Sequence, residues 1–132
     1  MIDFSNEIFN AVAKDLRAAY NGIKVVGEYV QSPTAFPTVT IDEISNWPVH
    51  QDTAVQNKYA QVSYRVQVFS NKTNGKRAQA REIYGRLDEL LQSLGFQAVS
   101  YTTTPAIYNS EVYCITATYN AVIDRNGVIY RG

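Results

Sequence analysis

The residues of this chain that could do chemistry are few. Its 132 residues include one histidine, His50, and one cysteine, Cys114. A single histidine cannot build a histidine-based metal cluster, so a zinc site would need carboxylates and the one thiol. Cys114 alternates with strand-like residues, and no basic residue near it in sequence would activate the thiol. We therefore expect no metal, no cofactor and no cysteine nucleophile.

Two pairs of neighbouring carboxylates, Asp42 with Glu43 and Asp88 with Glu89, are the candidates for acid and base pairs. Neighbours on a strand point to opposite faces, and neighbours on a helix diverge by about 100°. Neither pair is therefore arranged to share a substrate. We interpret both as solvated charges.

The segment SNKTNGKRA, residues 70–78, comes nearest to a nucleotide-binding motif. A phosphate-binding loop has Gly, four residues, and then Gly-Lys-Ser/Thr before a helix. Gly75 and Lys76 fit, but Ser70 replaces the first glycine and Arg77 replaces the hydroxyl residue. Both the backbone cradle for phosphate and the ligand for magnesium are missing, so we expect a strand-to-helix joint.

Four cations surround this joint, and we call them the basic corner: Lys72, Lys76, Arg77 and Arg81. The positive end of a helix dipole makes each exposed cation unfavourable by a few tenths of a kcal/mol. One explanation is a solvated, soluble helix start. The other is contact with an anionic partner, either DNA or an acidic neighbouring subunit.

The composition is that of one globular domain spanning residues 1–132. Hydrophobic residues make up 45% of the chain and charged residues 18%, and twelve basic residues balance twelve acidic ones. No net charge draws the protein to nucleic acid or to an anionic membrane, and no apolar run approaches the ~20 residues of a membrane helix. We expect a soluble protein. Its ten tyrosines are amphipathic and favoured at interfaces, which suggests surface for contact. The alternative is that most of these rings fill the core, and burial tendencies favour the core for any single tyrosine.

The spacing of hydrophobic residues predicts the helices and strands. Helical spacing predicts a helix from about Ser5 to Tyr20 and a second whose apolar residues run from Ala80 to Leu94, with Gly95 ending it. Strands are predicted at 23–30 and 38–42 as a hairpin-like pair, at 60–68, from 96 until Pro105, and at 111–124, followed by a short strand or tail at 128–131.

This order, α-β-β-β-α-β-β, predicts an α+β fold: a mainly antiparallel sheet of about five strands with two helices packed on one face. Within the strand at 60–68, every second residue is polar, so one face of the sheet should be wet or should contact a partner. Residues 45–58 have no period and are predicted to form a long exposed loop. Ordering such a loop costs roughly 1–2 kcal/mol per residue, which favours partner contact. The candidate interface residues are Trp47, His50, Gln61, Ser63, Arg65 and Gln67.

Four sequence segments, taken together, resemble those of one protein family. They are FPTVTIDEIS, YAQVSYRVQVFSNK, GKRAQAREIYGRLDELLQSLGF and ITATYNAVIDRNGVIYR, and they span nearly the whole chain in order. The pattern resembles the tail terminator, or tail completion, proteins of long-tailed bacteriophages and prophages. It is a pattern of elements and phrases rather than an invariant motif.

The resemblance implies a structural virion protein of the tail, assembled in the bacterial cytoplasm and without enzymatic activity. Such proteins form a ring, usually a hexamer, that caps the tail tube, ends tube polymerisation and presents the surface for head attachment. The implied partners are further copies of the chain, the tail-tube protein, head-tail connector proteins, and DNA that passes through the lumen without sequence specificity. In that setting the basic corner could line the lumen, and no membrane is involved.

Two alternatives remain open. One is a head-to-tail joining or stopper protein of the same apparatus, which the sequence does not separate from a terminator. The other is a small nucleic-acid-binding α+β module that stacks bases on exposed rings. The balanced charge and the lack of an aromatic and basic strand motif argue against the second.

Overall fold

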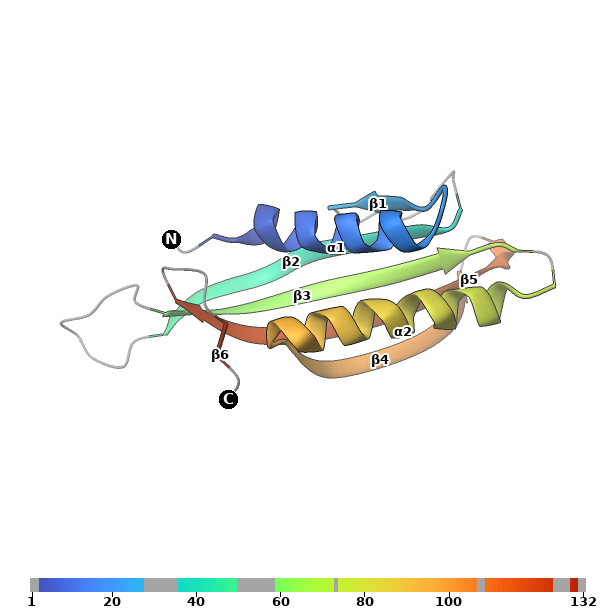
Figure 1. The fold of residues 1–132 in the computed structure, drawn as a ribbon. Coiled ribbons are helices and arrows are strands. Elements are labelled where there is room, and N and C mark those ends of the chain that lie inside the picture. The colour runs from blue at the N-terminus through green and yellow to red at the C-terminus, as the bar shows by residue number, and fades with distance from the viewer. Residues whose placement is uncertain are drawn as a thin grey trace.

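The computed structural model describes residues 3–27, 36–49, 59–72, 74–106, 109–124 and 129–130. These residues form two helices and six strands (Figure 1). The elements in chain order are α1 (Ser5–Ala19), β1 (Lys24–Val26), β2 (Thr38–Val49), β3 (Tyr59–Ser70), α2 (Lys76–Leu94), β4 (Gln97–Ala106), β5 (Asn109–Asp124) and β6 (Ile129–Tyr130).

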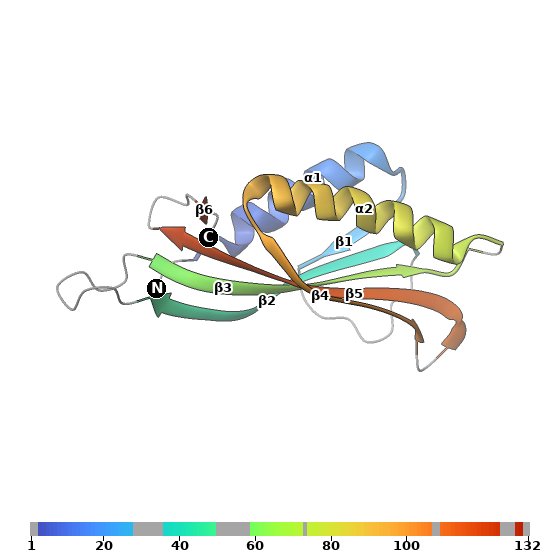
Figure 2. The same cartoon turned by 90° about the horizontal axis from the view of Figure 1, so that it is seen from below.

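The strands form one mixed sheet in the order β1-β2-β3-β5-β4, with the short β6 pairing to β5. Only β1 and β2 are parallel, and every other pair is antiparallel. Both helices lie on the same side of the sheet, as Figure 2 shows edge-on. The predicted α+β class, with two helices on one face of a mainly antiparallel sheet, is confirmed.

The alternation of β3 places one set of its side chains under the helices. Ala60, Val62, Tyr64, Val66 and Val68 are buried, while the residues between them remain more accessible up to Gln67. Successive side chains of a strand point to opposite faces, so this period of two defines the core face of the sheet. The face turned away from the helices is called the open face below.

The two helices cover the core face with apolar stripes. Their buried residues are Ile8, Val12, Ala13 and Leu16 of α1 and Ala80, Ile83, Leu87 and Leu91 of α2. Burying each large aliphatic side chain contributes roughly 1.5–3 kcal/mol. Gly95 ends α2 in a left-handed conformation, with φ 108°, as the sequence predicted. A bidentate ion pair joins the two helices. Arg86 Nε lies 2.9 Å from Asp15 Oδ2, and Arg86 Nη2 lies 3.1 Å from Asp15 Oδ1.

A hydroxyl network lies between α2 and the sheet. The Tyr119 hydroxyl donates to Asp88 Oδ1 and lies 2.7 Å from the Tyr84 hydroxyl. Burial raises the pKa of Tyr119, and its bond to Asp88 raises it further. Asp88 therefore satisfies a buried hydroxyl, and the interpretation of Asp88 as a merely solvated charge was wrong.

The prediction that the first two strands form a hairpin-like pair was also wrong. β1 is described only over Lys24–Val26, residues 28–35 lie outside the described residues, and β1 runs parallel to β2 instead of forming a hairpin. Eleven residues separate the two strands, more than a tight hairpin needs, and alternation alone carries no information on strand direction.

The prediction that residues 45–49 belong to a loop was wrong, and the remainder of that predicted loop, residues 50–58, lies outside the described residues. β2 continues to Val49 because its pairing with β3 resumes after a shift between Glu43 and Ser45, where Ile44 is the extra residue. The bulge reverses the alternation and hides the strand from sequence periodicity. Pro48 is tolerated because no described strand pairs with this part of β2 on the side away from β3.

β4 likewise runs through Pro105 to Ala106, where the sequence predicted an interruption. Proline is tolerated on edge strands, and β4 is the last strand of the sheet. None of the described helices is long and apolar enough to cross a membrane.

Candidate interaction surfaces

Polar side chains form cross-strand rows on the open face. One row crosses three strands: Thr40 Oγ1 donates to Gln67 Oε1 at 3.3 Å, and Gln67 Nε2 donates to Thr116 Oγ1 at 3.4 Å. Thr40 is buried and Gln67 is half-buried. The predicted interface residue Gln67 is therefore fixed by its own neighbours.

Two further predicted residues are engaged on the same face. Ser63 Oγ donates to Asn120 Oδ1 at 2.6 Å, and Arg65 Nη2 lies 3.3 Å from Asp42 Oδ2. A partly exposed ion pair of this kind contributes at most about 1 kcal/mol to stability. These bonds hold the donors and acceptors of the open face in fixed places, which lowers the entropy cost of binding a partner.

Trp47 stands at one end of the open face. It lies opposite Gln61 in the β2–β3 register and keeps 70% of its surface exposed. Tryptophan is enriched at the anchors of protein interfaces, so an exposed indole beside the exposed Gln61 is a candidate contact. Of the predicted interface residues, His50 lies outside the described residues.

The opposite end of the open face is apolar. Phe69, Val112 and Cys114 form a small buried cluster, with Phe36 packed against it. Burial raises the pKa of the Cys114 thiol, whose sulfur lies 3.6 Å from Thr116 Oγ1. A buried thiol of this kind packs as a small apolar group.

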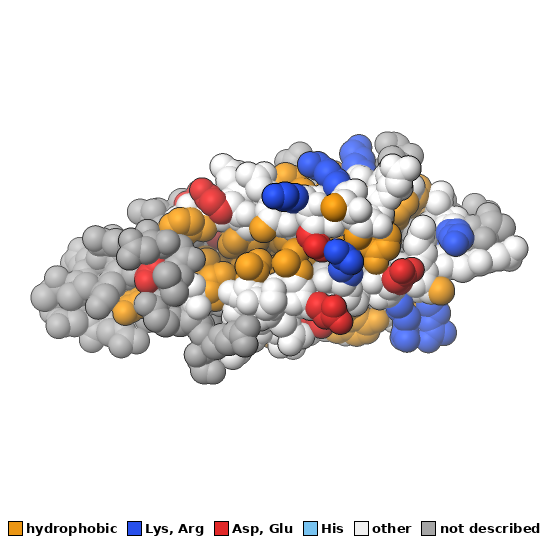
Figure 3. Space-filling model, viewed as in Figure 1, with side chains coloured by type: hydrophobic (Ala, Val, Ile, Leu, Met, Phe, Trp, Pro, Cys, Tyr) orange, Lys and Arg blue, Asp and Glu red, His pale blue; other side chains and the backbone are white. Residues whose placement is uncertain are grey.

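The basic corner lies beyond this end, where β3 passes into α2. Lys72, Arg77 and Arg81 are exposed and Lys76 is half-buried, and Figure 3 shows Lys and Arg side chains at the end where α2 begins. Ser70 Oγ donates to Gln79 Oε1, which fastens the strand to the first turns of the helix. No side chain caps the helix after Gly75. The segment is a strand-to-helix joint, and its contact with DNA stays a prediction.

Trp47 and the basic corner lie at opposite ends of the sheet. Trp47 pairs with Gln61, whereas Lys72 lies two residues beyond Ser70, the last residue of β3. At roughly 3.3 Å per residue, the strand from Gln61 to Ser70 spans about 30 Å. The long axis of the molecule therefore joins an aromatic end to a cationic end.

Sequence periodicity missed two exposed aliphatic residues. Ile44 and Val99 keep 46% and 58% of their surfaces exposed, and each lies at a register shift, in β2 and β4 respectively. A bulge appears in sequence only as a break in alternation. The sequence IDEIS around Ile44 contains such a break, but nothing in the sequence distinguishes it from the start of a loop.

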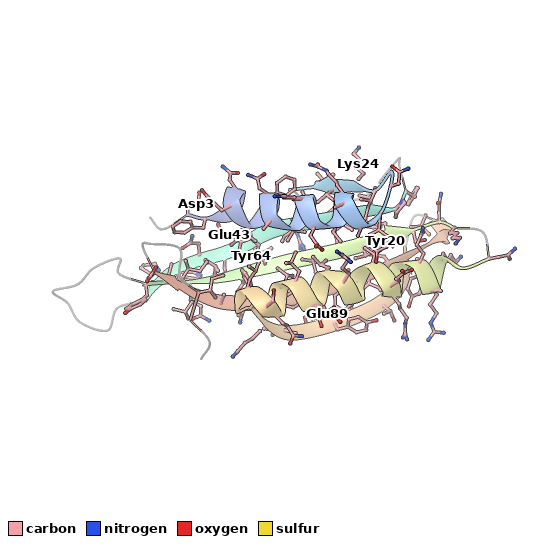
Figure 4. The ribbon with its side chains drawn as sticks, viewed as in Figure 1. Asp3, Tyr20, Lys24, Glu43, Tyr64 and Glu89 are labelled. Atoms are coloured by element: carbon pink, nitrogen blue, oxygen red, sulfur yellow. The ribbon has the colours of Figure 1, made fainter. Side chains whose placement is uncertain are left out.

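Glu43 departs from the sequence interpretation as a solvated charge. It lies beneath the start of α1 and accepts a hydrogen bond from the Tyr64 hydroxyl at 3.2 Å (Figure 4). Burial raises the pKa of the Glu43 carboxyl, its bond with Tyr64 partly opposes that shift, and the nearby charge of Asp3 adds to it. Its partner in sequence, Asp42, faces the open side and pairs with Arg65.

Among the described residues, no three His, Cys, Asp or Glu side chains are close enough to hold a metal ion. No known family model matches the chain. A search of characterised proteins also gives no match. Function must therefore be argued from the surfaces themselves.

Proposed function

We propose that this protein is a structural component of a long-tailed phage tail, forming a ring that caps the tail tube, ends its polymerisation and offers the surface for head attachment. The observation that carries the proposal is the pair of unlike ends on one sheet, with Trp47 at one and the basic corner at the other. The resemblance of the sequence to tail terminator proteins supports the same function.

A cap must bind differently on its two sides. One rim contacts the last ring of tube subunits, and the other contacts the connector proteins of the head. If the strands run along the ring axis, the aromatic end and the basic corner lie on opposite rims, separated by about 30 Å of strand. We assign the aromatic rim to protein contact and the basic rim to the side that DNA meets.

The open face suits the interior or a partner-facing wall of such a ring. Its polar rows are held by internal hydrogen bonds, so the wall is hydrophilic without a dense charge. In this proposal the protein has no enzymatic activity and no cofactor. Its partners are further copies of itself, tube protein, connector proteins and DNA without sequence specificity, in the virion tail after assembly in the bacterial cytoplasm.

Native mass spectrometry tests the proposal first. We expect a ring, or a monomer that becomes a ring when mixed with the tail-tube protein encoded in the same genome. A chain that remains a monomer and never binds tubes would refute the proposal. A ring that binds connector proteins while leaving tube growth unchanged would indicate the joining or stopper function instead.

The basic corner gives a separate prediction. Replacing Lys72, Lys76 and Arg77 by Gln should leave the ring intact and weaken its salt-dependent binding to duplex DNA, because each lost phosphate contact reduces counterion release. The matched control replaces Lys14, Arg17 and Lys24, exposed cations elsewhere on the molecule, and should change DNA binding less. Both are measured by fluorescence anisotropy across salt concentrations.

Loss of the ring in the basic-corner variant would place these cations in a subunit interface. Salt-sensitive DNA binding with micromolar or better affinity by a monomer that forms no ring would favour the nucleic-acid-binding module.

A further inference from the structure

β4 forms an exposed edge of the sheet. It pairs with β5 on one side, and no described strand pairs with it on the other. Six consecutive residues, Gln97 to Thr102, are exposed, and Val99 and Tyr101 keep 58% and 44% of their surfaces accessible. Unpaired edges are templates for another strand, and proteins commonly protect them with charge. Between the bulge at Val99 and Pro105, β4 is regular and has no charged residue.

The opposite edge of the sheet is less open to a second copy. β1 pairs with β2 over Thr38–Thr40, and the β2 edge beyond this pairing contains Asp42 and Glu43. Two such edges brought together by a two-fold axis would place like charges close to each other. β1 itself offers only three residues, and both a short strand and a lysine, here Lys24, discourage pairing. Pairing of β4 with β4 meets none of these obstacles.

The core face of β4 is bare beside its edge. Ala98 pairs with Tyr119, and Tyr101 pairs with Ala117, so both point to the side that carries the helices. Both are nevertheless exposed, because α2 packs mainly on β3 and β5 and β4 emerges beyond the helix (Figure 1). The rings of Tyr84 and Tyr101 lie in contact, with centroids 5.1 Å apart. These two residues therefore mark the same level on α2 and β4.

The flank of α2 that borders β4 carries opposite charges on either side of this level. Arg81 precedes Tyr84 by three residues and Asp88 follows it by four, spacings that put all three on one flank. Asp88 gives the direction of this flank, because it accepts a hydrogen bond from Tyr119 of β5. Arg77 lies one turn before Arg81, and Figure 3 shows Lys and Arg side chains near the start of α2. The flank is basic before Tyr84 and acidic after it.

A two-fold axis at Tyr101 makes these charges complementary. It pairs β4 antiparallel with β4 of a second copy and sets the two α2 helices antiparallel on one side of the joined sheet. At 1.5 Å per residue, Arg81 lies about 4.5 Å to one side of the level of Tyr84, and Asp88 lies about 6 Å to the other. Arg81 of each copy therefore comes level with Asp88 of the other. The helix axes are about 19 Å apart, four strand spacings, so long side chains bring these charges within a screening length of about 8 Å.

We propose that the free chain pairs with a second copy through β4, antiparallel about a two-fold axis at Tyr101, with Arg81 of each copy facing Asp88 of the other. Both copies contribute the same residues, so the contact is isologous. The axis reverses one copy relative to the other, whereas neighbours in a ring with unlike rims all point the same way. The pair is therefore a state of the free chain, in equilibrium with the monomer that the proposed ring would recruit, and it does not rest on the capping function.

Like charges at the axis test the pairing. Tyr101→Lys places two lysines opposite each other, and the chain should still fold because the side chain is exposed on an edge strand. Val99→Lys is the matched control on the same strand, since its two lysines lie about 13 Å apart along the strands. Sedimentation velocity over a concentration series measures association. We expect wild type and Val99→Lys to dimerise as concentration rises and Tyr101→Lys to remain monomeric.

The charges on α2 give a second test that leaves β4 unaltered. Arg81→Glu turns both attractions across the seam into repulsions and should weaken the dimer about tenfold, whereas Arg81→Lys should retain it. Arg17→Glu makes the same change at an exposed cation of α1 and should leave the dimer unchanged. Added salt should narrow the difference between wild type and Arg81→Glu, because it screens both the attraction and the repulsion.

Disulfide formation locates the axis. In a Cys114→Ala background, Tyr101→Cys should link two copies on mild oxidation, because opposite residues of antiparallel strands have Cα atoms about 5 Å apart, within disulfide range. Val99→Cys should link them far more slowly, since the two sulfurs are too distant. Faster linking through Val99→Cys than through Tyr101→Cys would overturn the proposed axis.

The pairing and the capping function fail in different ways. A wild-type chain that shows only monomers or only rings at every concentration overturns the pairing, and so does equal dimerisation of wild type and Tyr101→Lys. Neither result touches the capping function, which is measured on tube ends. A dimer that never forms a ring or binds a tube when tube protein is added overturns the capping function and leaves the pairing standing.

Discussion

At the scale of single residues, Glu43 is a carboxylate whose pKa changes on folding. Burial raises its pKa above the ordinary value of 4.5, so the folded chain holds the Glu43 proton more tightly than the unfolded chain. The carboxylate is consequently a destabilising group once it ionises. The Tyr64 hydroxyl offsets part of this cost by donating a hydrogen bond to it.

We predict that Glu43→Gln makes the protein more stable than wild type near neutral pH, since the amide oxygen still accepts from Tyr64 and no charge is buried. The gain should be absent below pH 4.5 and should grow as pH rises through the interval just above it, where wild-type Glu43 loses its proton. Urea unfolding of both proteins at several pH values measures this difference in unfolding free energy. Glu89→Gln on the exposed side of α2 is the control (Figure 4). A gain independent of pH would contradict the burial argument.

At the scale of elements, the end of α2 depends on a glycine. Gly95 has φ 108°, and a Cβ there would lie 2.7 Å from Ile129 Cγ2 of β6. Both the backbone conformation and the close approach of the C-terminal strand exclude a side chain. The helix end and β6 are therefore coupled.

We predict that Gly95→Ala lowers the free energy of unfolding by roughly 1–3 kcal/mol, the usual cost of a strained backbone position. Gly85 is the matched control, because it lies in the exposed middle of α2 with nothing within 4 Å of its missing Cβ. Gly85→Ala should instead raise the free energy of unfolding by about 0.5–1 kcal/mol. Chemical denaturation compares the two, and equal effects in one direction would refute the packing of β6 on the helix end.

The elements that the sequence predicts well are those with an uninterrupted period. Both helices, β3 and β5 follow their alternation or helical spacing closely, and Gly95 ends α2 as expected. The errors occur at the sheet edges. There a bulge at Ile44 and a tolerated proline at Pro105 break the period without ending the strand.

Alternation also explains why the sequence predicted the candidate surfaces only in part. Alternation placed Gln61, Ser63, Arg65 and Gln67 on the face away from the helices, and the structure puts them there. Alternation does not reveal which strand lies beside which, so the cross-strand rows of the open face emerge only from the register of the strands.

At the scale of the whole molecule, the architecture is a single sheet with helices on one side, two edges with no further partner among the described strands, and two unlike ends. Free edges at the sides permit lateral joining of copies. Unlike ends permit different partners above and below the joined sheet. A ring that binds a tube on one rim and presents a new surface on the other needs both properties.

The length distribution of tail tubes tests this account most directly. Tube protein from the same genome is polymerised alone and with increasing amounts of this protein, and tube lengths are measured by negative-stain electron microscopy. We predict shorter tubes, each capped by a ring at one end, with no increase in nucleation. Unchanged lengths and bare tube ends at saturating protein would contradict the proposed function.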